Sequence, residues 1–425
     1  MKSRTKPALR AVPTTTTFQI TLPMRELLAD VQHAFVGLCV ESGKQALAQM
    51  MEHDRVVLCG AKGVPNAQRS AVRGGHTHSQ IVLGGQRIRV PRPRARRLDA
   101  GELELPTFTW AADRDPLDAA TLSAIAGGVS TRKYARIQDK LPSPDVGIAT
   151  SKSAVSRRFV ALSQQQLRAW QRRRLDELDL AVVMIDGIHF HERVVLVALG
   201  IDTEGNKHVL GLHEGSTENE RVAKKLLSDL IDRGLKAWRM RLWVIDGGKA
   251  LRRAIVDCFG DTALIQRCQE HKRRNVLDHL PKQMHANVNR TLHQAYAAKT
   301  AGLARRQLTR LADSLEAQHP GAAASLREGL DETLTALELG LDGALYRTLR
   351  TTNPIENLNG LIAQHTRNVK RWKDGAMTLR WIASALSEAA QRFRKLRGHA
   401  QMKAFLKTLQ SRAPVDFDDQ ERKAA

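Results

Sequence analysis

The apolar residues of this chain follow two patterns, and the change between them divides the sequence. In residues 23–53, and again between 117 and 174, they recur at the spacing of amphipathic helices. From residue 179 onward they form short continuous runs rich in β-branched residues, such as AVVMI at 181–185. Such runs are typical of strands that are buried on both faces. We therefore predict a first part with several helices and a second part of the α/β class.

The α/β part is predicted to begin with three strands and to continue with alternating helices and strands. The turn Thr203-Glu204-Gly205 marks a hairpin between the second and third strands. The expected order is strand 181–185, strand 193–202, strand 206–215, helix 218–235, strand 241–245, helix 249–258 and strand 263–268. This is the order of an RNase H-like sheet, in which the first and fourth strands lie side by side at the centre.

Two of these strands are expected to end in an Asp-Gly pair, at Asp186 and at Asp246. A buried and unpaired carboxylate is costly, so either residue alone is explained by a solvated turn after a core strand. Two neighbouring strands with the same ending instead bring both carboxylates to one end of the sheet. Such carboxylates repel each other unless a divalent cation lies between them. We therefore predict a cation site there.

A helical segment, residues 272–345, interrupts the sheet pattern and is predicted to be an all-helical insertion. The sequence TTNPIENLN follows it, with Asn353 as the expected N-cap of a helix and Pro354 in its first turn. Glu356 then lies in the first turn, where Glu is a common choice that stabilises the helix dipole. A last amphipathic and basic helix is expected at about 375–410.

The part before residue 179 combines helices with a run of arginines. Helix 23–53 is a candidate oligomerisation helix, and a plain core helix is an equal alternative. In residues 84–97 the alternation of RIRV suggests a short strand, and the prolines that follow it force an extended path. Residues 116–175 resemble a helix-turn-helix region with a basic last helix, a pattern that small helical bundles share.

Charge favours a nucleic-acid partner. The 425 residues carry a formal net charge of +23, which indicates a polyanionic partner. A basic membrane-surface protein is the alternative, but no apolar run approaches the ~20 residues of a membrane span, and no secretory segment opens the chain. The four cysteines include no CxxC pair, which suits a reducing cytoplasm. The basic residues expected to contact DNA are Arg87, Arg89, Arg92, Arg94, Lys152, Arg157, Arg158, Arg367, Lys370 and Arg371.

One further motif, Cys268-x-x-His271, has the spacing of half a zinc site. No second pair with ligand spacing is near it, because His279, His285 and His293 are isolated. Spacing alone therefore favours a structural zinc site only weakly.

Together these motifs resemble the Mutator-type insertion-sequence transposases of bacteria. The resemblance rests on the two Asp-Gly strand ends, the Cys-x-x-His motif, TTNPIENLN and the basic HTRNVKRW, and it covers most of residues 70–400. It implies a DDE triad of Asp186, Asp246 and Glu356 that binds Mg²⁺ or Mn²⁺. Many DDE transposases have Lys or Arg seven residues after the Glu, whereas Ala363 stands here. Arg367, Lys370 and Arg371 are the candidate replacements.

The resemblance also implies the domains and their roles. They are an N-terminal basic region (1–110), a helix-turn-helix DNA-binding region (111–178), an RNase H-like catalytic domain in two parts (179–271 and 346–412) and the all-α insertion (272–345).

The implied protein is a transposase of the cytoplasm and nucleoid that binds terminal inverted repeats and target DNA as a homodimer or larger assembly. Its metal ions would activate water or a 3′-hydroxyl for cleavage and strand transfer. A non-catalytic repressor derived from a transposase, and a metal-dependent nuclease or resolvase of the same fold, are the alternatives. The intact triad favours the enzyme.

Overall fold

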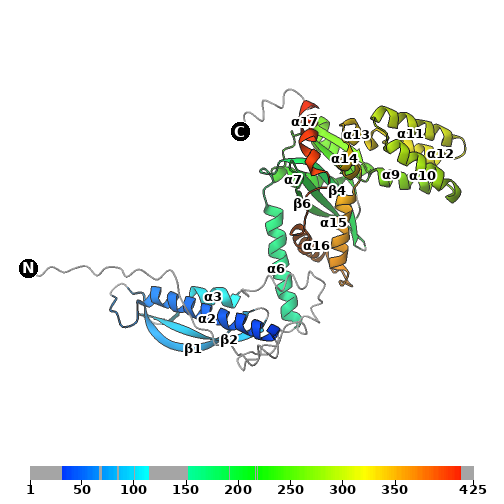
Figure 1. The fold of residues 1–425 in the computed structure, drawn as a ribbon. Coiled ribbons are helices and arrows are strands. Elements are labelled where there is room, and N and C mark those ends of the chain that lie inside the picture. The colour runs from blue at the N-terminus through cyan, green and yellow to red at the C-terminus, as the bar shows by residue number, and fades with distance from the viewer. Residues whose placement is uncertain are drawn as a thin grey trace, which may run out of the picture. The chain divides into compact units, whose positions relative to one another are not determined.

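The computed structural model describes residues 31–66, 69–83, 86–99, 101–113, 152–190, 192–215, 217 and 219–412 (Figure 1). The described chain divides into two compact units between Phe159 and Val160, inside α6 (Lys152–Arg172). We call them the N-terminal unit and the C-terminal unit. Among the described helices, none combines the length and the apolarity needed to cross a membrane.

The N-terminal unit is a long helix packed on a small antiparallel sheet. Helix α2 (Val31–Cys59) contacts strands β1 (Ala71–Leu83) and β2 (Gln86–Arg97) and helix α3 (Pro106–Asp113). The short β3 (Glu102–Leu103) is the third strand. Apolar side chains from each element form the core, among them Met51, Ile81, Ile88, Val90 and Leu105. The helix predicted at 23–53 is thus confirmed over its described part and extends six residues further, to Cys59.

Strand β2 is longer than the sequence indicated, because it continues through both prolines. His78 pairs with Pro91 and His76 with Pro93, so β1 accompanies the strand throughout. On the opposite edge β3 pairs only with Ala95 and Arg96. Proline lacks the N–H that a second neighbouring strand would need, and among the described residues neither proline pairs with a second strand. The strand β1 was not predicted, because its glycines and histidines hide the apolar alternation.

The predicted helix-turn-helix region falls mostly outside the described residues. This applies to the helices expected at 117–128 and 131–141. The third expected helix, from about Ser151 to Arg174, corresponds to α6, on which Phe159 and Leu167 are buried.

The C-terminal unit is built on a five-stranded mixed sheet with the order β6-β5-β4-β7-β8. Its strands are β4 (Leu180–Phe190), β5 (Arg193–Asp202), β6 (Lys207–Gly215), β7 (Arg241–Ile245) and β8 (Ala263–Arg267). The first three are antiparallel, and β7 runs parallel to both β4 and β8. The α/β class is therefore confirmed, and the first and fourth strands of this unit do lie side by side.

Helices cover both faces of this sheet. Val183 and Ile185 of β4 lie in one core with α7 (Glu220–Asp232) and α8 (Lys249–Phe259). Val182 and Met184 lie in the other, with α14 (Gly343–Leu349), α15 (Asn353–Thr366), α16 (Gly375–Ala390) and α17 (Met402–Arg412). Successive strand residues point to opposite faces, so the single apolar run of β4 contributes side chains to both cores.

Strand β4 does not end at Asp186, as the sequence suggested, but continues to Phe190. Its parallel neighbour β7 pairs only with Val182 to Met184 and ends at Ile245. From Asp186 onward the strand therefore has only β5 beside it, where Asp186 pairs with Val197. The aspartate still lies where the central pair of strands comes apart, which is the feature that the prediction required.

The segment predicted as an insertion is helical and has its own core. It comprises α9 (Gln269–Asp278), α10 (Lys282–Tyr296), α11 (Ala301–Glu316), α12 (Pro320–Arg327) and the short α13 (Thr335–Glu338) (Figure 1). Val288, Leu292, Leu308 and Leu326 are among its buried residues. The single helix expected at 375–410 is wrong, because α16 and α17 are separate helices. Gly398 between them has φ 93°, and a Cβ there would collide with the backbone of Leu345.

Strand β6 is an edge strand of the sheet, and two arginines bind its carbonyl groups. The register shifts at Leu210, whose carbonyl oxygen accepts a 2.6 Å hydrogen bond from Arg233 Nη2. Arg173 Nη2 donates at 2.6 Å to the carbonyl of Val209. The Arg233 side chain is buried and forms an ion pair with Asp229 at 2.8 Å.

We predict that Arg233→Ala lowers the free energy of unfolding by about 2–3 kcal/mol, because it leaves buried carbonyl groups without a donor. Urea unfolding of the full chain measures this. Arg221→Ala, on the exposed surface of α7, is the control and should change stability by less than about 0.5 kcal/mol. Equal effects of the two substitutions would contradict the role assigned to Arg233.

Candidate active site

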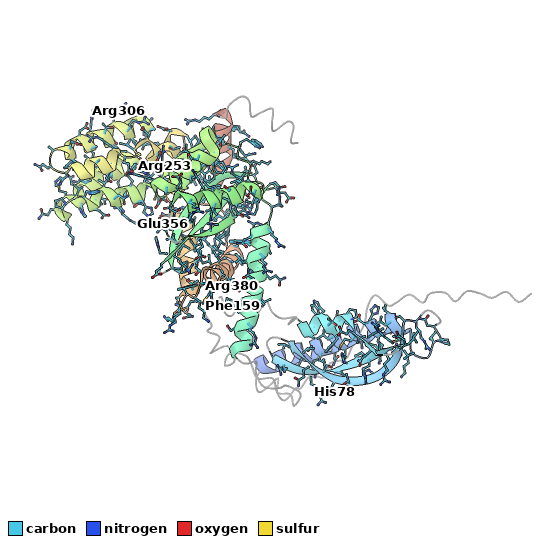
Figure 2. The ribbon with its side chains drawn as sticks, turned by 180° about the vertical axis from the view of Figure 1, so that it is seen from behind. His78, Phe159, Arg253, Arg306, Glu356 and Arg380 are labelled. Atoms are coloured by element: carbon cyan, nitrogen blue, oxygen red, sulfur yellow. The ribbon has the colours of Figure 1, made fainter. Side chains whose placement is uncertain are left out.

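Three acidic side chains from different elements interact electrostatically near the point where β4 and β7 separate. Asp186 lies on β4 and Asp246 directly follows β7. Glu356, which Figure 2 labels, lies in the first turn of α15. Burial, and then the negative charges of Asp246 and Glu356, raise the pKa of Asp186 to about 6. The structure thus places Asp186 within electrostatic range of the other two residues that the sequence singled out.

The Asp246 loop has a conformation that requires glycine. Gly247 has φ 109°, and the Gly248 N–H donates to Asp246 Oδ1 at 2.9 Å. The buried Arg267 side chain lies against the loop, and its Nη2 donates to the Gly247 carbonyl at 2.6 Å. A Cβ on Gly247 would lie 2.5 Å from Arg267 Nε. The Asp-Gly pair therefore reflects both a tight turn and a close side-chain contact.

Glu356 is held by a threonine one turn before it. Thr352 Oγ1 donates to Glu356 Oε1 at 2.6 Å, and Thr352 is completely buried. Thr352 also occupies the N-cap position of α15, one residue before the Asn353 that the sequence suggested. Its hydroxyl binds the carboxylate and makes no capping hydrogen bond to the helix backbone.

The Cys-x-x-His motif lies beside Glu356. His271 Nδ1 is 3.7 Å from Glu356 Oε1, and the donor atoms of Cys268, His271 and Glu356 all lie within 4.8 Å of one another. Burial alone would raise the pKa of the Cys268 thiol, but hydrogen bonds with His271 and Thr352 outweigh it and lower that pKa. The same contact with Cys268 raises the pKa of His271. The residue that joins Cys268 and His271 as a third potential metal ligand is thus Glu356, which lies far from the motif in sequence.

Asn359 is a site residue that the sequence analysis missed. Its Nδ2 donates to Asp186 Oδ2 at 2.8 Å, while its Oδ1 is buried without a hydrogen-bond partner. Residues three apart lie on the same face of a helix, so its position after Glu356 in NPIENLN was the available signal.

The basic residues expected to bind DNA differ in their surroundings. Arg367, Lys370 and Arg371 are exposed just beyond α15. The neighbouring Trp372 packs edge-on against Phe190, with the two ring centroids 4.9 Å apart. This contact fixes the basic segment to the extended end of β4. Arg157 is exposed on α6, whereas the side chains of Lys152 and Arg158 lie outside the described residues.

The arginine run of β2 divides into two pairs. Arg87 and Arg89 are exposed. Arg92 and Arg94 instead form ion pairs with Glu102 at 3.3 and 2.9 Å, and Arg92 lies 4.7 Å from the centre of the Phe108 ring. The second pair therefore has a structural role within the N-terminal unit.

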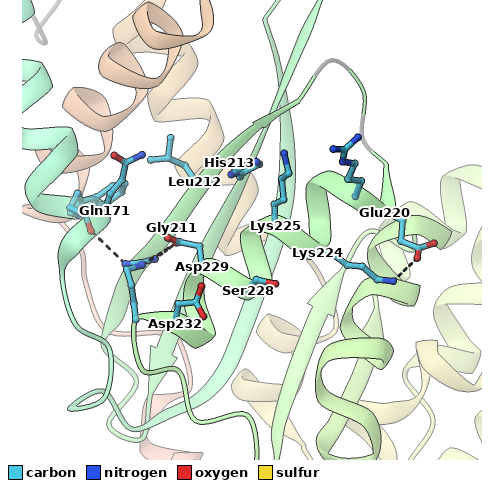
Figure 3. A pocket seen from close by; sticks show the side chains of 13 residues that line it. Gln171, Gly211, Leu212, His213, Glu220, Lys224, Lys225, Ser228, Asp229 and Asp232 are labelled. Carbon is cyan, nitrogen blue, oxygen red and sulfur yellow. Dashed lines mark hydrogen bonds and ion pairs between the residues drawn. The ribbon is translucent and has the colours of Figure 1, made fainter.

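A pocket of about 950 Å³ lies away from the three carboxylates (Figure 3). It is lined by the end of α6, by β6 and by α7, with Trp170, His213, Lys225 and Asp229 among its residues. Its lining includes none of the residues predicted for catalysis or DNA binding, so the pocket does not mark the candidate site.

The three carboxylates are a donor set of the kind that a hard divalent cation prefers, although the described side chains whose ligand atoms all lie within 4.8 Å of one another are those of Cys268, His271 and Glu356. Three carboxylates offer the oxygen ligands that Mg²⁺ and Mn²⁺ prefer, and their mutual repulsion would fall when a cation binds. The unpartnered Asn359 Oδ1 is a further oxygen beside Asp186.

Removing the charge of Asp186 should stabilise the metal-free protein. Since the pKa rises from 3.8 to about 6 on folding, the ionised carboxylate destabilises the fold above pH 6, by about 2–3 kcal/mol. We predict that Asp186→Asn raises the Tm at pH 8 in EDTA and that the difference disappears near pH 4. Thermal unfolding measures this, with the exposed Glu177→Gln as control. An unchanged or lower Tm at pH 8 would contradict the cluster.

Comparison with known proteins identifies the family. The model of the family described as "Transposase, Mutator family" matches residues 19–395. The transposase for insertion sequence element ISRM5 of Rhizobium meliloti (strain 1021) is 28% identical over 339 residues, covering 77% of this chain and 81% of that protein. The transposase for insertion sequence element IS256 in transposon Tn4001 of Staphylococcus aureus is 26% identical over 356 residues, covering 80% and 87%. Because the family match spans most of the sequence and agrees with the motifs, the chain belongs to the Mutator family of transposases.

Proposed function

We propose that this protein is a transposase that binds the terminal inverted repeats of its insertion sequence and catalyses metal-dependent DNA strand cleavage and strand transfer. The observation that carries the proposal is the electrostatic interaction of Asp186 with Asp246 and Glu356 near the point where β4 and β7 separate. The strand order β6-β5-β4-β7-β8 supports an RNase H-like catalytic domain. The family relationship supports the same activity.

In this proposal each acidic residue has a ligand role and a partner that orients it. Asp186, Asp246 and Glu356 would hold Mg²⁺ or Mn²⁺, and the bound ions would activate water or the 3′-hydroxyl of the DNA and stabilise the leaving oxygen. Asn359 Nδ2 orients Asp186, and the Gly248 N–H orients Asp246. Since one phosphodiester is exchanged for another, strand transfer requires no nucleotide cofactor.

DNA binding in this proposal uses exposed basic residues in both units. Arg87 and Arg89 on β2 and Arg157 on α6 are exposed in the part expected to bind the element ends. Arg367, Lys370 and Arg371 would contact DNA near the active site. The net charge of +23 supports such a partner, and the nucleoid of the cytoplasm is the corresponding location.

We further propose that at least two copies act together on DNA. Joining two element ends requires two active sites held together. Met50 and Val57 on α2 are 50% and 69% exposed, which makes this helix a candidate contact between copies.

We predict that Asp186→Asn, Asp246→Asn and Glu356→Gln each reduce strand nicking by at least about a hundredfold, because each removes one metal-binding charge. DNA binding should remain, since it rests on other residues. The measurement is nicking and strand transfer on DNA carrying the element ends at saturating Mg²⁺, with binding followed on the same preparations.

The matched control for this series is Glu220→Gln, which removes a charge from a surface ion pair with Lys224 and should leave nicking unchanged. A triad variant that nicks at the wild-type rate would remove that residue from the site. Nicking without strand transfer by the wild-type protein would favour a nuclease, and binding without nicking would favour a repressor.

The two arginine pairs of β2 give a second prediction. Replacing the exposed Arg87 and Arg89 by Ala should weaken DNA binding and lower the slope of log K against log salt by up to about 2, because two phosphate contacts are lost. Replacing Arg92 and Arg94 should change that slope less, since Glu102 already neutralises them in part. Fluorescence anisotropy between 50 and 300 mM KCl distinguishes the pairs, and equal slopes would contradict the assignment.

A further inference from the structure

One buried hydroxyl stands at the centre of the group formed by Cys268, His271 and Glu356. Thr352 Oγ1 lies 2.6 Å from Glu356 Oε1, 3.3 Å from Cys268 Sγ and 3.4 Å from His271 Nδ1. The Thr352 backbone N–H also donates to Cys268 Sγ, at 3.5 Å. The side chains of Cys268, His271 and Glu356 therefore all contact the hydroxyl group of Thr352.

The distances indicate where the hydroxyl proton goes. A hydroxyl group has one proton to donate and two lone pairs that accept. The contact with Glu356 is much the shortest, so the carboxylate receives the proton, and an N–H of His271 can donate to the same oxygen. The backbone N–H of Thr352 still binds the sulfur. The contacts with Cys268 and His271 therefore surround the hydroxyl oxygen while its proton points toward Glu356.

The same residues connect Glu356 to Asp246. The Cys268 backbone N–H donates at 2.8 Å to the carbonyl of Ile245, the residue before Asp246. The Cys268 side chain contacts Thr352, which precedes Glu356 by one helical turn. Cys268 is completely buried. One cysteine thus links the end of β7 with the start of α15.

The arrangement does not favour a soft metal ion between Cys268, His271 and Glu356. A zinc ion would need to lie about 2.0–2.3 Å from each ligand atom. The Thr352 hydroxyl already lies between these atoms and bonds to them at hydrogen-bond distances. The motif is therefore organised around the threonine.

We propose that Thr352, supported by Cys268 and His271, is a positioning residue that fixes the Glu356 carboxylate for metal binding. The inference rests on the proposed function, because it assigns Glu356 as a metal ligand. The Glu356 side chain is 33% exposed, so without this contact it has space to adopt other rotamers. Partners that orient metal ligands commonly change metal affinity 10–100-fold when they are removed.

The test compares Thr352→Val with Thr366→Val in the full chain. Thr366 is a matched control, because it is also a buried threonine of α15 and its hydroxyl donates only to backbone carbonyls of the same helix. We expect Thr352→Val to bind end DNA normally and to weaken Mn²⁺ binding, followed by electron paramagnetic resonance, at least tenfold. The Mn²⁺ concentration for half-maximal nicking should rise in parallel. Thr352→Ser should return both values to within about threefold of wild type, and Cys268→Ala should give an intermediate shift.

Two results would overturn the proposal. One is a Thr352→Val protein whose Mn²⁺ binding matches that of Thr366→Val. The other is stoichiometric Zn²⁺ binding that is lost in Cys268→Ala and His271→Ala, because the ion would then replace the hydroxyl as the centre of the group. Glu356→Gln, measured alongside, separates this proposal from the proposed function: if it nicks normally, Glu356 is not a ligand; if it is inactive while Thr352→Val matches its control, only the positioning role fails.

Discussion

The partly buried carboxylate of Asp186, with Asp246 and Glu356 near it, is the constraint on which the candidate site depends. Burial and two neighbouring negative charges raise the pKa of Asp186 to about 6, which means that folding disfavours the ionised form of this carboxyl group. The chain supplies one close donor to each carboxylate: Asn359 Nδ2 to Asp186, the Gly248 N–H to Asp246 and Thr352 Oγ1 to Glu356. These donors orient the oxygen atoms without neutralising their charge, and in the proposed site a divalent cation would neutralise it.

The helical insertion also contributes to the site, although it carries none of the three carboxylates. The buried Arg267 side chain donates to the carbonyl of Gly247 beside Asp246 and to the carbonyl of Glu328 after α12. Gln266 and Gln269 both donate to the carbonyl of Thr333, at 2.9 and 2.8 Å. The end of β8 is therefore hydrogen-bonded to the active-site loop on one side and to the insertion on the other. This explains how a long insertion before Glu356 is compatible with a precise carboxylate position.

The sequence predicted strand bounds best where both faces of a strand are buried. The bounds of β5 follow directly from a run that is apolar on both faces, and the same reasoning located the apolar first half of β4. The same reasoning failed to predict that β4 continues beyond Asp186. The second half of β4 pairs with one strand, β5, and its polar residues resemble a turn. The proximity of Asp186 and Asp246 could be predicted because Asp186 follows the apolar half of β4 and Asp246 follows β7, the strand beside it.

The donors to those carboxylates could not be predicted in the same way. Thr352 meets Cys268 across 84 positions of sequence, and that contact depends on how the intervening helices fold back. The break between α16 and α17 depends similarly on tertiary contacts, since the Leu396 N–H donates to the carbonyl of Gly205 at 2.8 Å. Local sequence patterns carry no information about the residues that Thr352 and Leu396 contact.

The central claim is that Asp186, Asp246 and Glu356 together bind the catalytic metal. The most direct measurement is a crystal structure of the protein with Mn²⁺ and end DNA, in which anomalous scattering locates the ions. The account predicts Mn²⁺ bound by oxygen atoms of all three carboxylates, at about 2.1–2.2 Å. Mn²⁺ bound elsewhere on the C-terminal unit, with these carboxylates uncoordinated, would contradict it.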